Sequence, residues 1–195
     1  MSKPLQRIFV GAACALLSLG AWAAPDSWGG SGEAPATASF VAASSGQLVA
    51  YYTGFSGGYV NSIGVRVNGG ADSAPGLDNR SAYGASLVLG NVMAGDTLVF
   101  FIDANSGAAR YYTDPTLNHD GLGGASVNHA WATAYAGDSL VPAGTHIAFE
   151  DLPGGGDFNY RDHGFVFEIT AVPEPASWAL MLFGAAGLAA LRRRR

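Results

Sequence analysis

The sequence predicts an all-β fold, an antiparallel β-sandwich of the jelly-roll kind, flanked by an N-terminal signal peptide and a C-terminal transmembrane helix. Short apolar or alternating runs recur between clusters of Gly, Asn and Asp, and these runs are rich in aromatic and β-branched residues. No segment between the two ends shows a helical period. We therefore divide the chain into a signal peptide (1–24), a linker (25–38), a sandwich domain (39–171) and a tail (172–195).

Residues 1–24 have the order of a cleaved secretory signal, with a basic start, an apolar core over 8–19 and small residues around the Ala21-Trp22-Ala23 site. We expect export through the Sec translocon and cleavage by signal peptidase. Cys14, the single cysteine of the chain, would leave with the leader. Acylation of Cys14 as in a lipoprotein is the alternative, but Gly-Ala-Ala precedes it and the apolar core continues beyond it.

The middle of the chain has the pattern of strands. Residues 25–37 are rich in Gly, Pro and Ser and are typical of a linker. Further along, Phe165, Phe167 and Ile169 share one face of an expected strand, and Val166, Glu168 and Thr170 share the other, a period of two. The run 98–102 is continuously apolar, as in a strand covered on both faces. The expected strands are 47–52, 62–68, 85–89, 97–103, 129–135, 145–151 and 164–170.

The tail begins with Val172-Pro173-Glu174-Pro175 and ends with Arg192, Arg193, Arg194 and Arg195. The uncharged run between them, 176–191, reaches ~24 Å as a helix against a hydrocarbon layer of ~30 Å. The terminal arginines stay in the cytoplasm under the positive-inside bias and act as a membrane stop, which leaves the body outside. An ordinary C-terminal anchor is the alternative to a temporary one.

These parts, in this order, closely resemble the PEP-CTERM sorting signal of Gram-negative bacteria. The resemblance implies that an exosortase, a membrane-embedded cysteine transpeptidase, recognises and cleaves the tail. It also implies an association with exopolysaccharide. The protein would then pass through an inner-membrane intermediate to the cell surface or the extracellular matrix.

The body between leader and tail is acidic. It has four arginines and no lysine against fourteen Asp and Glu residues, a net charge of −10. This balance argues against a nucleic-acid partner, whose phosphates need basic patches. It is compatible with binding of divalent cations or with an ordinary solvated acidic surface.

The stretch FEDLPGGGDFNYRDHGFVF, residues 149–167, combines acidic residues with a glycine-rich loop. Ca²⁺ takes six to eight oxygen ligands at flexible distances, and glycines allow the backbone to fold around the ion. The stretch lacks the twelfth-position Glu and the flanking helices of an EF-hand. A hairpin turn rich in Asp and Gly is the alternative. The candidate metal ligands are Glu150, Asp151, Asp157, Asn159 and Asp162.

Together with SGGYVNSIGVRVNG (57–70) and the run 98–121, this stretch resembles the DUF4114 domain over about 40–171. The resemblance implies that the same five residues fall on an acidic cluster that holds calcium. The chain departs from the family pattern at Asn159 and Arg161, and His163-Gly164 lengthens the approach to the last strand. The positive charge of Arg161 lowers the expected affinity.

Catalytic alternatives are weaker. The letters around Ser56 fit G-x-S-x-G, but a strand is expected to follow in place of the helix that a nucleophile elbow needs. His119, Asp120 and His129 fit no short zinc motif. Glu150 and Asp151 are adjacent on an expected strand and would point to opposite faces, although Glu150 with Asp162 or Glu168 stays open as an acid/base pair.

We therefore expect a secreted, non-catalytic surface or matrix protein that binds Ca²⁺, with a surface-displayed polysaccharide hydrolase as the alternative. Aromatic side chains offer stacking faces to a sugar, or pack in the core. The aromatic candidates are Tyr51, Tyr59, Tyr111, Tyr112 and Trp131.

Overall fold

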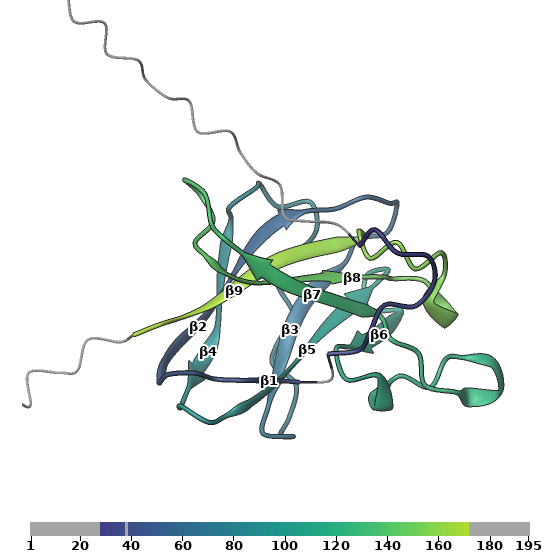
Figure 1. Cartoon of the computed structure of the whole chain (residues 1–195), viewed down its shortest axis with the longest axis horizontal. Coiled ribbons are helices and arrows are strands. Elements are labelled where there is room, and N and C mark those ends of the chain that lie inside the picture. The colour runs from purple at the N-terminus through teal and green to yellow at the C-terminus, as the bar shows by residue number, and fades with distance from the viewer. Residues whose placement is uncertain (1–27, 38, 172–195) are drawn as a thin grey trace, which may run out of the picture.

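The computed structural model describes residues 28–37 and 39–171 and places them in two antiparallel β-sheets that pack face to face (Figure 1). The all-β expectation is confirmed. The expected signal peptide, the sorting motif Val172 to Pro175, the helix 176–191 and the terminal arginines lie outside the described residues. Within the described part of the chain, no helix has both the length and the apolar character needed to cross a membrane.

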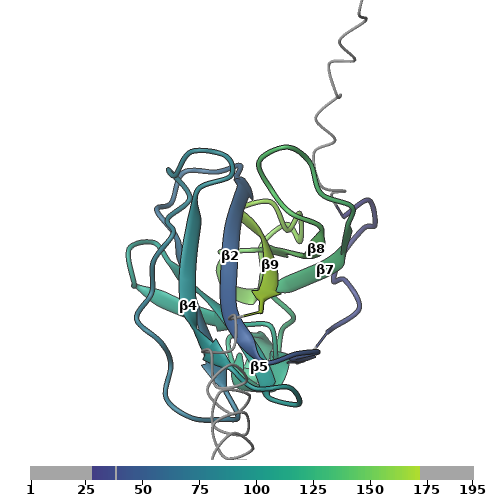
Figure 2. The ribbon, with the colours of Figure 1, turned by 90° about the vertical axis from the view of Figure 1, so that its left-hand side faces the viewer.

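The larger sheet has five strands, and Figure 2 shows them side by side. Register is set across its centre, where Ala50 is opposite Phe167 and Tyr52 is opposite Phe165. In order across the sheet the strands are β4 (Ser86–Val92), β2 (Gly46–Gly54), β9 (His163–Thr170), β8 (Gly144–Phe149) and β7 (Ala130–Tyr135).

The smaller sheet is built around β5 (Thr97–Ala104). One side of β5 pairs with β3 (Ser62–Val67), and the other side pairs with β1 (Phe40–Val41) and β6 (Ala109–Tyr112). The run 98–102 is buried throughout, as predicted, because its inner side chains enter the core and Arg110 lies 4.2 Å over the ring of Phe101 on the outer face.

The core lies between the sheets and follows the period of two in the sequence. Phe165 is fully buried and packs against Phe100 at 5.4 Å between ring centroids, while Phe167 and Ile169 pack against the same cluster. Val166, on the opposite face of β9, belongs to a separate cluster with Tyr135. The predicted facing of this strand is therefore confirmed.

All seven predicted strands are present, within three residues at each end. Two further strands, β1 and β6, were not predicted; both are short and pair along one side of β5. The jelly-roll connectivity stays a prediction. One boundary matters for function, because β8 ends at Phe149 and Glu150 and Asp151 lie beyond it.

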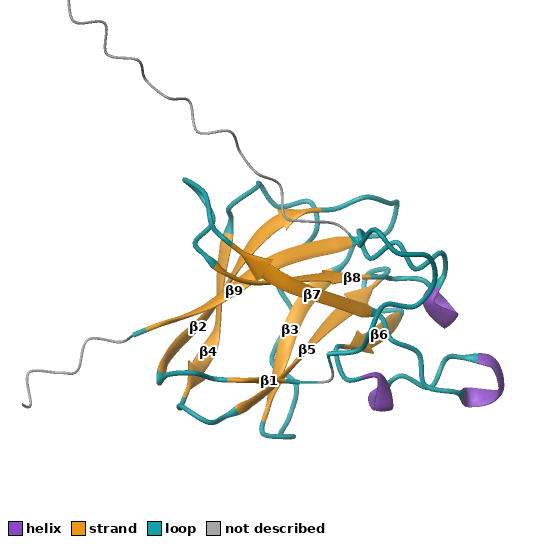
Figure 3. Ribbon diagram, in the orientation of Figure 1, coloured by secondary structure: helices purple, strands orange, loops and turns teal. Residues whose placement is uncertain are grey.

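Three short 3₁₀ turns lie at one end of the sandwich (Figure 3). Strand β9 starts at that end and runs to the opposite end, where the described chain stops at residue 171. Eight residues at ~3.3 Å each separate the two ends by ~26 Å. The turns are η1 (Pro115–Leu117), η2 (Leu122–Gly124) and η3 (Pro153–Gly155).

The described part of the expected linker packs on the outer face of the larger sheet. The backbone N–H of Ala34 donates to the buried Tyr160 hydroxyl at 2.9 Å, and the Asn128 side chain donates to the Ala34 carbonyl at 2.9 Å. The Trp28 ring lies 6.1 Å from that of Trp131. These contacts join the start of the domain to the loop that precedes β9.

Candidate metal centre

Three carboxylates meet at the end of the sandwich that carries the 3₁₀ turns. Glu150, Asp151 and Asp162 each place an oxygen within 4.8 Å of the others, and all three are buried. At Ca–O distances of ~2.3–2.6 Å, two oxygens on one ion lie at most ~5 Å apart. The spacing therefore fits ligands of a single cation.

The end of β8 explains how neighbours in sequence converge. On a continuous strand Glu150 and Asp151 would point to opposite faces, and that expectation is wrong because the strand stops at Phe149. Beyond it, Glu150 N–H still donates to the His129 carbonyl, at 2.9 Å, while Asp162 N–H donates to the Phe149 carbonyl, at 2.9 Å. These two hydrogen bonds hold both ends of the glycine-rich loop next to the end of β8.

Amide groups hold the carboxylates in place. The Asn61 amide donates to Asp151 Oδ2 at 2.7 Å and to the Asp162 carbonyl at 3.2 Å. Asp162 Oδ2 accepts from the Asp151 N–H at 3.3 Å. Glu150 accepts from the N–H groups of Leu152 and Asn159, at 3.1 and 3.3 Å.

Glycines keep space clear beside two of these oxygens. A Cβ at position 156 would lie 2.7 Å from Glu150 Oε1, and a Cβ at position 57 would lie 2.8 Å from Asp162 Oδ1. Both glycines have positive φ, +50° at Gly156 and +125° at Gly57, which a side chain would also disfavour. The absence of side chains there leaves room beside the carboxylates.

Burial makes the ionised forms of these acids costly. Desolvation raises the pKa of Glu150 to about 8, with a further contribution from the charge of Asp162. Burial also raises the pKa of Asp162 to about 7, reinforced by Asp151, and raises the pKa of Asp151. Burial therefore favours the protonated forms of these acids over the ionised ones.

Among the described residues, no ion pair involves these three carboxylates. Two of the four arginines in the described residues pair elsewhere, Arg66 with Asp72 at 2.7 Å and Arg110 with Asp72 and Asp103 at 2.7 and 2.5 Å. A buried charge needs pairing or a metal. The donor set is oxygen only and matches the preference of a hard divalent cation.

The other two predicted ligands lie at the rim of the loop. Asp157 is exposed and hydrogen-bonds with Asn159, which lowers its pKa, and it also interacts with Glu150. The Asn159 side-chain oxygen accepts from the Arg161 N–H at 2.8 Å. The structure thus brings three of the five candidates together and leaves Asp157 and Asn159 beside them.

A second polar group, formed by His129 and Asp120, contacts the loop. His129, fully buried, stacks on Tyr111 with centroids 3.8 Å apart, and its ring nitrogens lie 2.9 Å from the Glu150 carbonyl and 3.0 Å from Asp120 Oδ2. Both ring nitrogens therefore already have a hydrogen-bond partner within the domain. Asp120 also accepts from Gly154 N–H at 2.7 Å, while its Oδ1 is buried without a partner.

The remaining sequence candidates lie elsewhere. Ser56 is exposed in the loop between β2 and β3, and the strand predicted to follow it is present. Glu168 accepts from the Tyr51 hydroxyl at 2.9 Å on the outer face of the larger sheet, away from Asp162. His119 is exposed.

Of the aromatic candidates, Tyr59 is exposed (39%) and Tyr111 is buried. Tyr51, Tyr112 and Trp131 are half-buried.

Sequence reasoning missed the residues that organise the centre. Asn61 and Gly57 precede the start of β3, far from the acidic loop in sequence, and nothing in their local pattern indicates a role there. The Asp120–His129 pair was considered only as a zinc ligand set. Its actual contacts depend on the pairing of β7 with β8, which places the His129 carbonyl opposite Glu150.

Comparison with known proteins identifies the tail and nothing in the body. Residues 171–195 match the PEP-CTERM protein-sorting motif. No curated protein and no solved structure matches the chain. The chain therefore carries the sorting signal of an exosortase substrate, which indicates an exported protein with a C-terminal membrane-anchor region, sorted to the cell surface with an exosortase as processing partner.

Proposed function

We propose that the protein is a non-catalytic, Ca²⁺-binding β-sandwich displayed at the cell surface or in the exopolysaccharide matrix. The observation that carries this proposal is the group of Glu150, Asp151 and Asp162, three buried carboxylates with oxygens within 4.8 Å and no cationic partner among the described residues. A bound cation would offset the charge that burial otherwise penalises.

Calcium suits the site better than magnesium. Ca²⁺ accepts irregular sets of six to eight oxygens, whereas Mg²⁺ requires near-ideal octahedral geometry and keeps several waters. Here two ligands are sequence neighbours, and Asp162 enters from the far end of a glycine-rich loop. Asp157, at the rim, interacts with Glu150 and would be the next ligand to join the shell, whereas Asn159 would first have to release the Arg161 N–H.

Calcium binding would hold the loop in a fixed position relative to the rest of the domain. Tyr160 connects the loop to the N-terminal segment, and the carbonyls of Asn128 and His129 connect it to the residues just before β7. A ligand that binds only the folded form adds RT ln(1 + [L]/Kd) to stability, or ~2.7 kcal/mol at a hundredfold excess over Kd. We therefore propose a structural role for the ion in the exported protein.

The position of the site supports display away from the membrane. The acidic loop is at the start of β9, and the tail follows the other end of that strand. A domain tethered through residue 171 would direct the loop outward, toward polymer and medium. The resemblance of residues 40–171 to the DUF4114 domain also supports this proposal, because that resemblance implies an acidic cluster that holds calcium.

A calcium titration monitored by thermal unfolding tests the proposal. The melting temperature of the exported protein, first stripped with EDTA, should rise as the Ca²⁺ concentration passes the dissociation constant, and Mg²⁺ at equal concentration should raise it less. The same titration on Glu168→Gln, an isosteric change on the outer face of the sheet, should match the wild type. A melting temperature that ignores Ca²⁺ would contradict the proposal.

The hydrolase alternative rests on one observation, the pKa of Glu150 raised to about 8, which would keep a general acid protonated. Its carboxyl group lies closer to Asp162 than the ~5–5.5 Å of retaining glycosidases, and both are buried. Turnover of the producer's own polysaccharide that is lost in Glu150→Gln would favour the enzyme.

A further inference from the structure

An apolar groove opens at the end of the sandwich where β9 stops. Its volume is about 320 Å³, near the lower limit of ~300 Å³ for ligand pockets, so it holds one or two side chains. Strand β1, the turn after it, the start of β8 and the end of β9 form its walls. The apolar side chains that line it are Phe40, Val41, Ala43, Phe167 and Ile169.

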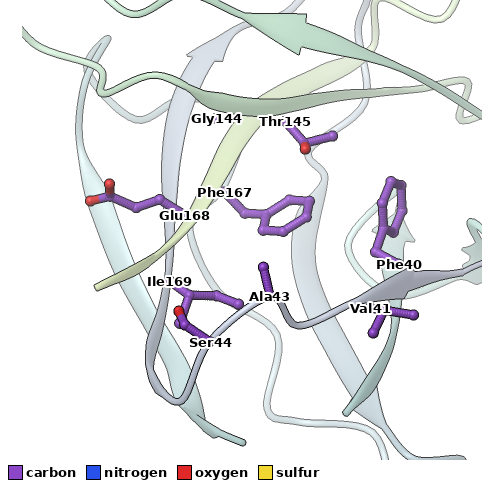
Figure 4. A pocket seen from close by; sticks show the side chains of 9 residues that line it. All are labelled: Phe40, Val41, Ala43, Ser44, Gly144, Thr145, Phe167, Glu168 and Ile169. Carbon is purple, nitrogen blue, oxygen red and sulfur yellow. The ribbon is translucent and has the colours of Figure 1, made fainter. Parts of the chain in front are cut away.

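The groove surface is aromatic and free of charge at its centre. The rings of Phe40 and Phe167 lie 5.4 Å apart with an interplanar angle of 73°. Figure 4 shows these rings and Ala43 gathered on one side of β9, with the carboxylate of Glu168 directed away from them. That carboxylate accepts from the Tyr51 hydroxyl at 2.9 Å, on the outer face.

Strand β9 also has one open edge beside the groove. Its pairing with β8 ends at Thr145 opposite Phe167, whereas its pairing with β2 continues to Thr170 opposite Gln47. Among the described strands, residues 168–170 therefore have a neighbour on one side only. An extended peptide next to an open edge and an apolar groove finds both backbone partners and side-chain pockets.

We propose that this groove binds the chain's own sorting motif, Val172 to Pro175. The motif begins one residue after the described end of the chain and three residues after Ile169, a lining residue. If residues 171 and 172 reverse the chain, the three extended residues after them span up to ~10 Å, enough to lie along the end of β9. Proline holds the motif extended, and proline-rich segments bind aromatic-lined grooves with little loss of conformational entropy.

Tethering favours this occupant over any other. A segment joined to its site by a short linker has an effective concentration in the millimolar range, so modest contacts with Phe40 and Phe167 suffice. Val172 and the two prolines supply apolar surface, and Glu174 between the prolines can stay at the solvent-exposed rim of the groove, which Val41 also forms. The domain thus presents the motif to the sorting enzyme at a fixed place, and cleavage requires its release from the groove.

Disulfide trapping in the full chain tests this docking. Cys14→Ser removes the native thiol, and the pair Val41→Cys with Glu174→Cys joins groove and motif; Val41 is 67% exposed. In cells without the sorting protease, which retain the tail, this pair should oxidise at least about tenfold faster than Leu122→Cys with Glu174→Cys. Leu122 is fully exposed and belongs to η2, one of the 3₁₀ turns at the opposite end of the sandwich.

Two further variants separate docking from mere tethering. Ala43→Phe fills the groove, and Pro173→Ser with Pro175→Ser frees the motif without changing the described domain. Each should slow trapping at Val41→Cys about tenfold. Unchanged trapping in the proline variant, or disulfides only between two copies of the chain, would overturn the proposal. Neither result bears on the cation site.

Discussion

Removing one charge from the carboxylate group should stabilise the calcium-free protein. We choose Asp162→Asn because the amide keeps an oxygen that accepts from the Asp151 N–H, whereas both oxygens of Glu150 accept backbone hydrogen bonds and an amide there would lose one. A removed hydrogen bond would obscure the electrostatic effect. Asp162→Asn therefore isolates the cost of the charge.

The size of the effect follows from the raised pKa of Asp162, about 7 in the folded protein against 3.8 for a free carboxyl. The folded form binds this proton more tightly, so the stability it contributes is complete below pH ~4 and is lost as pH rises through ~7. At ~1.4 kcal/mol per pKa unit the full loss is ~4 kcal/mol. Glu150 and Asp151 stay buried in the variant, and their burial still lowers the stability of the folded form. We therefore expect Asp162→Asn to recover about half of the lost stability, ~2 kcal/mol.

Thermal unfolding in EDTA measures this recovery. For a chain of this size, ~1 kcal/mol of stability shifts the melting temperature by ~2–4 °C. Asp162→Asn should therefore melt ~4–8 °C above the wild type at pH 8, and the difference should be less than half as large at pH 5. Saturating Ca²⁺ should reverse the order. A variant that melts below the wild type in EDTA at pH 8 would refute the reasoning, because Asp162 would then stabilise the ion-free fold.

The affinity for Ca²⁺ should rise between pH 6 and pH 8, since binding releases the protons held by Glu150 and Asp162; calorimetry in two buffers of different ionisation enthalpy detects that release. Gly156→Ala should weaken Ca²⁺ binding at least about tenfold because its Cβ meets Glu150 Oε1, whereas Gly69→Ala, at a similar positive φ with open space, should leave binding unchanged. Tyr160→Phe should lower the free energy of unfolding by ~1–3 kcal/mol, measured by urea titration, because it removes the buried acceptor of one backbone N–H. Deletion of 172–195 should move the protein from the cell surface to the medium, read by fractionation and immunoblotting.

Most of the fold could be predicted because seven of its strands have a clear residue pattern. The alternation around Phe165 and the continuous apolar run 98–102 each have a single structural meaning once helix is excluded. Strand β1 was missed because two residues carry no period, and β6 because its four residues follow a turn and pair only through β5.

The candidate site was predicted as a set of residues but not as a geometry. Local composition indicated an acidic loop, yet the convergence of Glu150 and Asp151 depends on where β8 ends. The contribution of Asn61 depends on β3 lying beside the loop, which no local pattern encodes. Burial of the carboxylates, the feature that most favours a cation, arises only in the folded sandwich.

Direct calcium-binding calorimetry on the EDTA-stripped, exported protein tests the central claim. We predict one Ca²⁺ ion per chain for the wild type and for Glu168→Gln, and loss of the binding heat in Asp162→Asn. Binding that survives unchanged in Asp162→Asn, or no binding by the wild type at millimolar Ca²⁺, would contradict the assignment of the buried carboxylates as a calcium site.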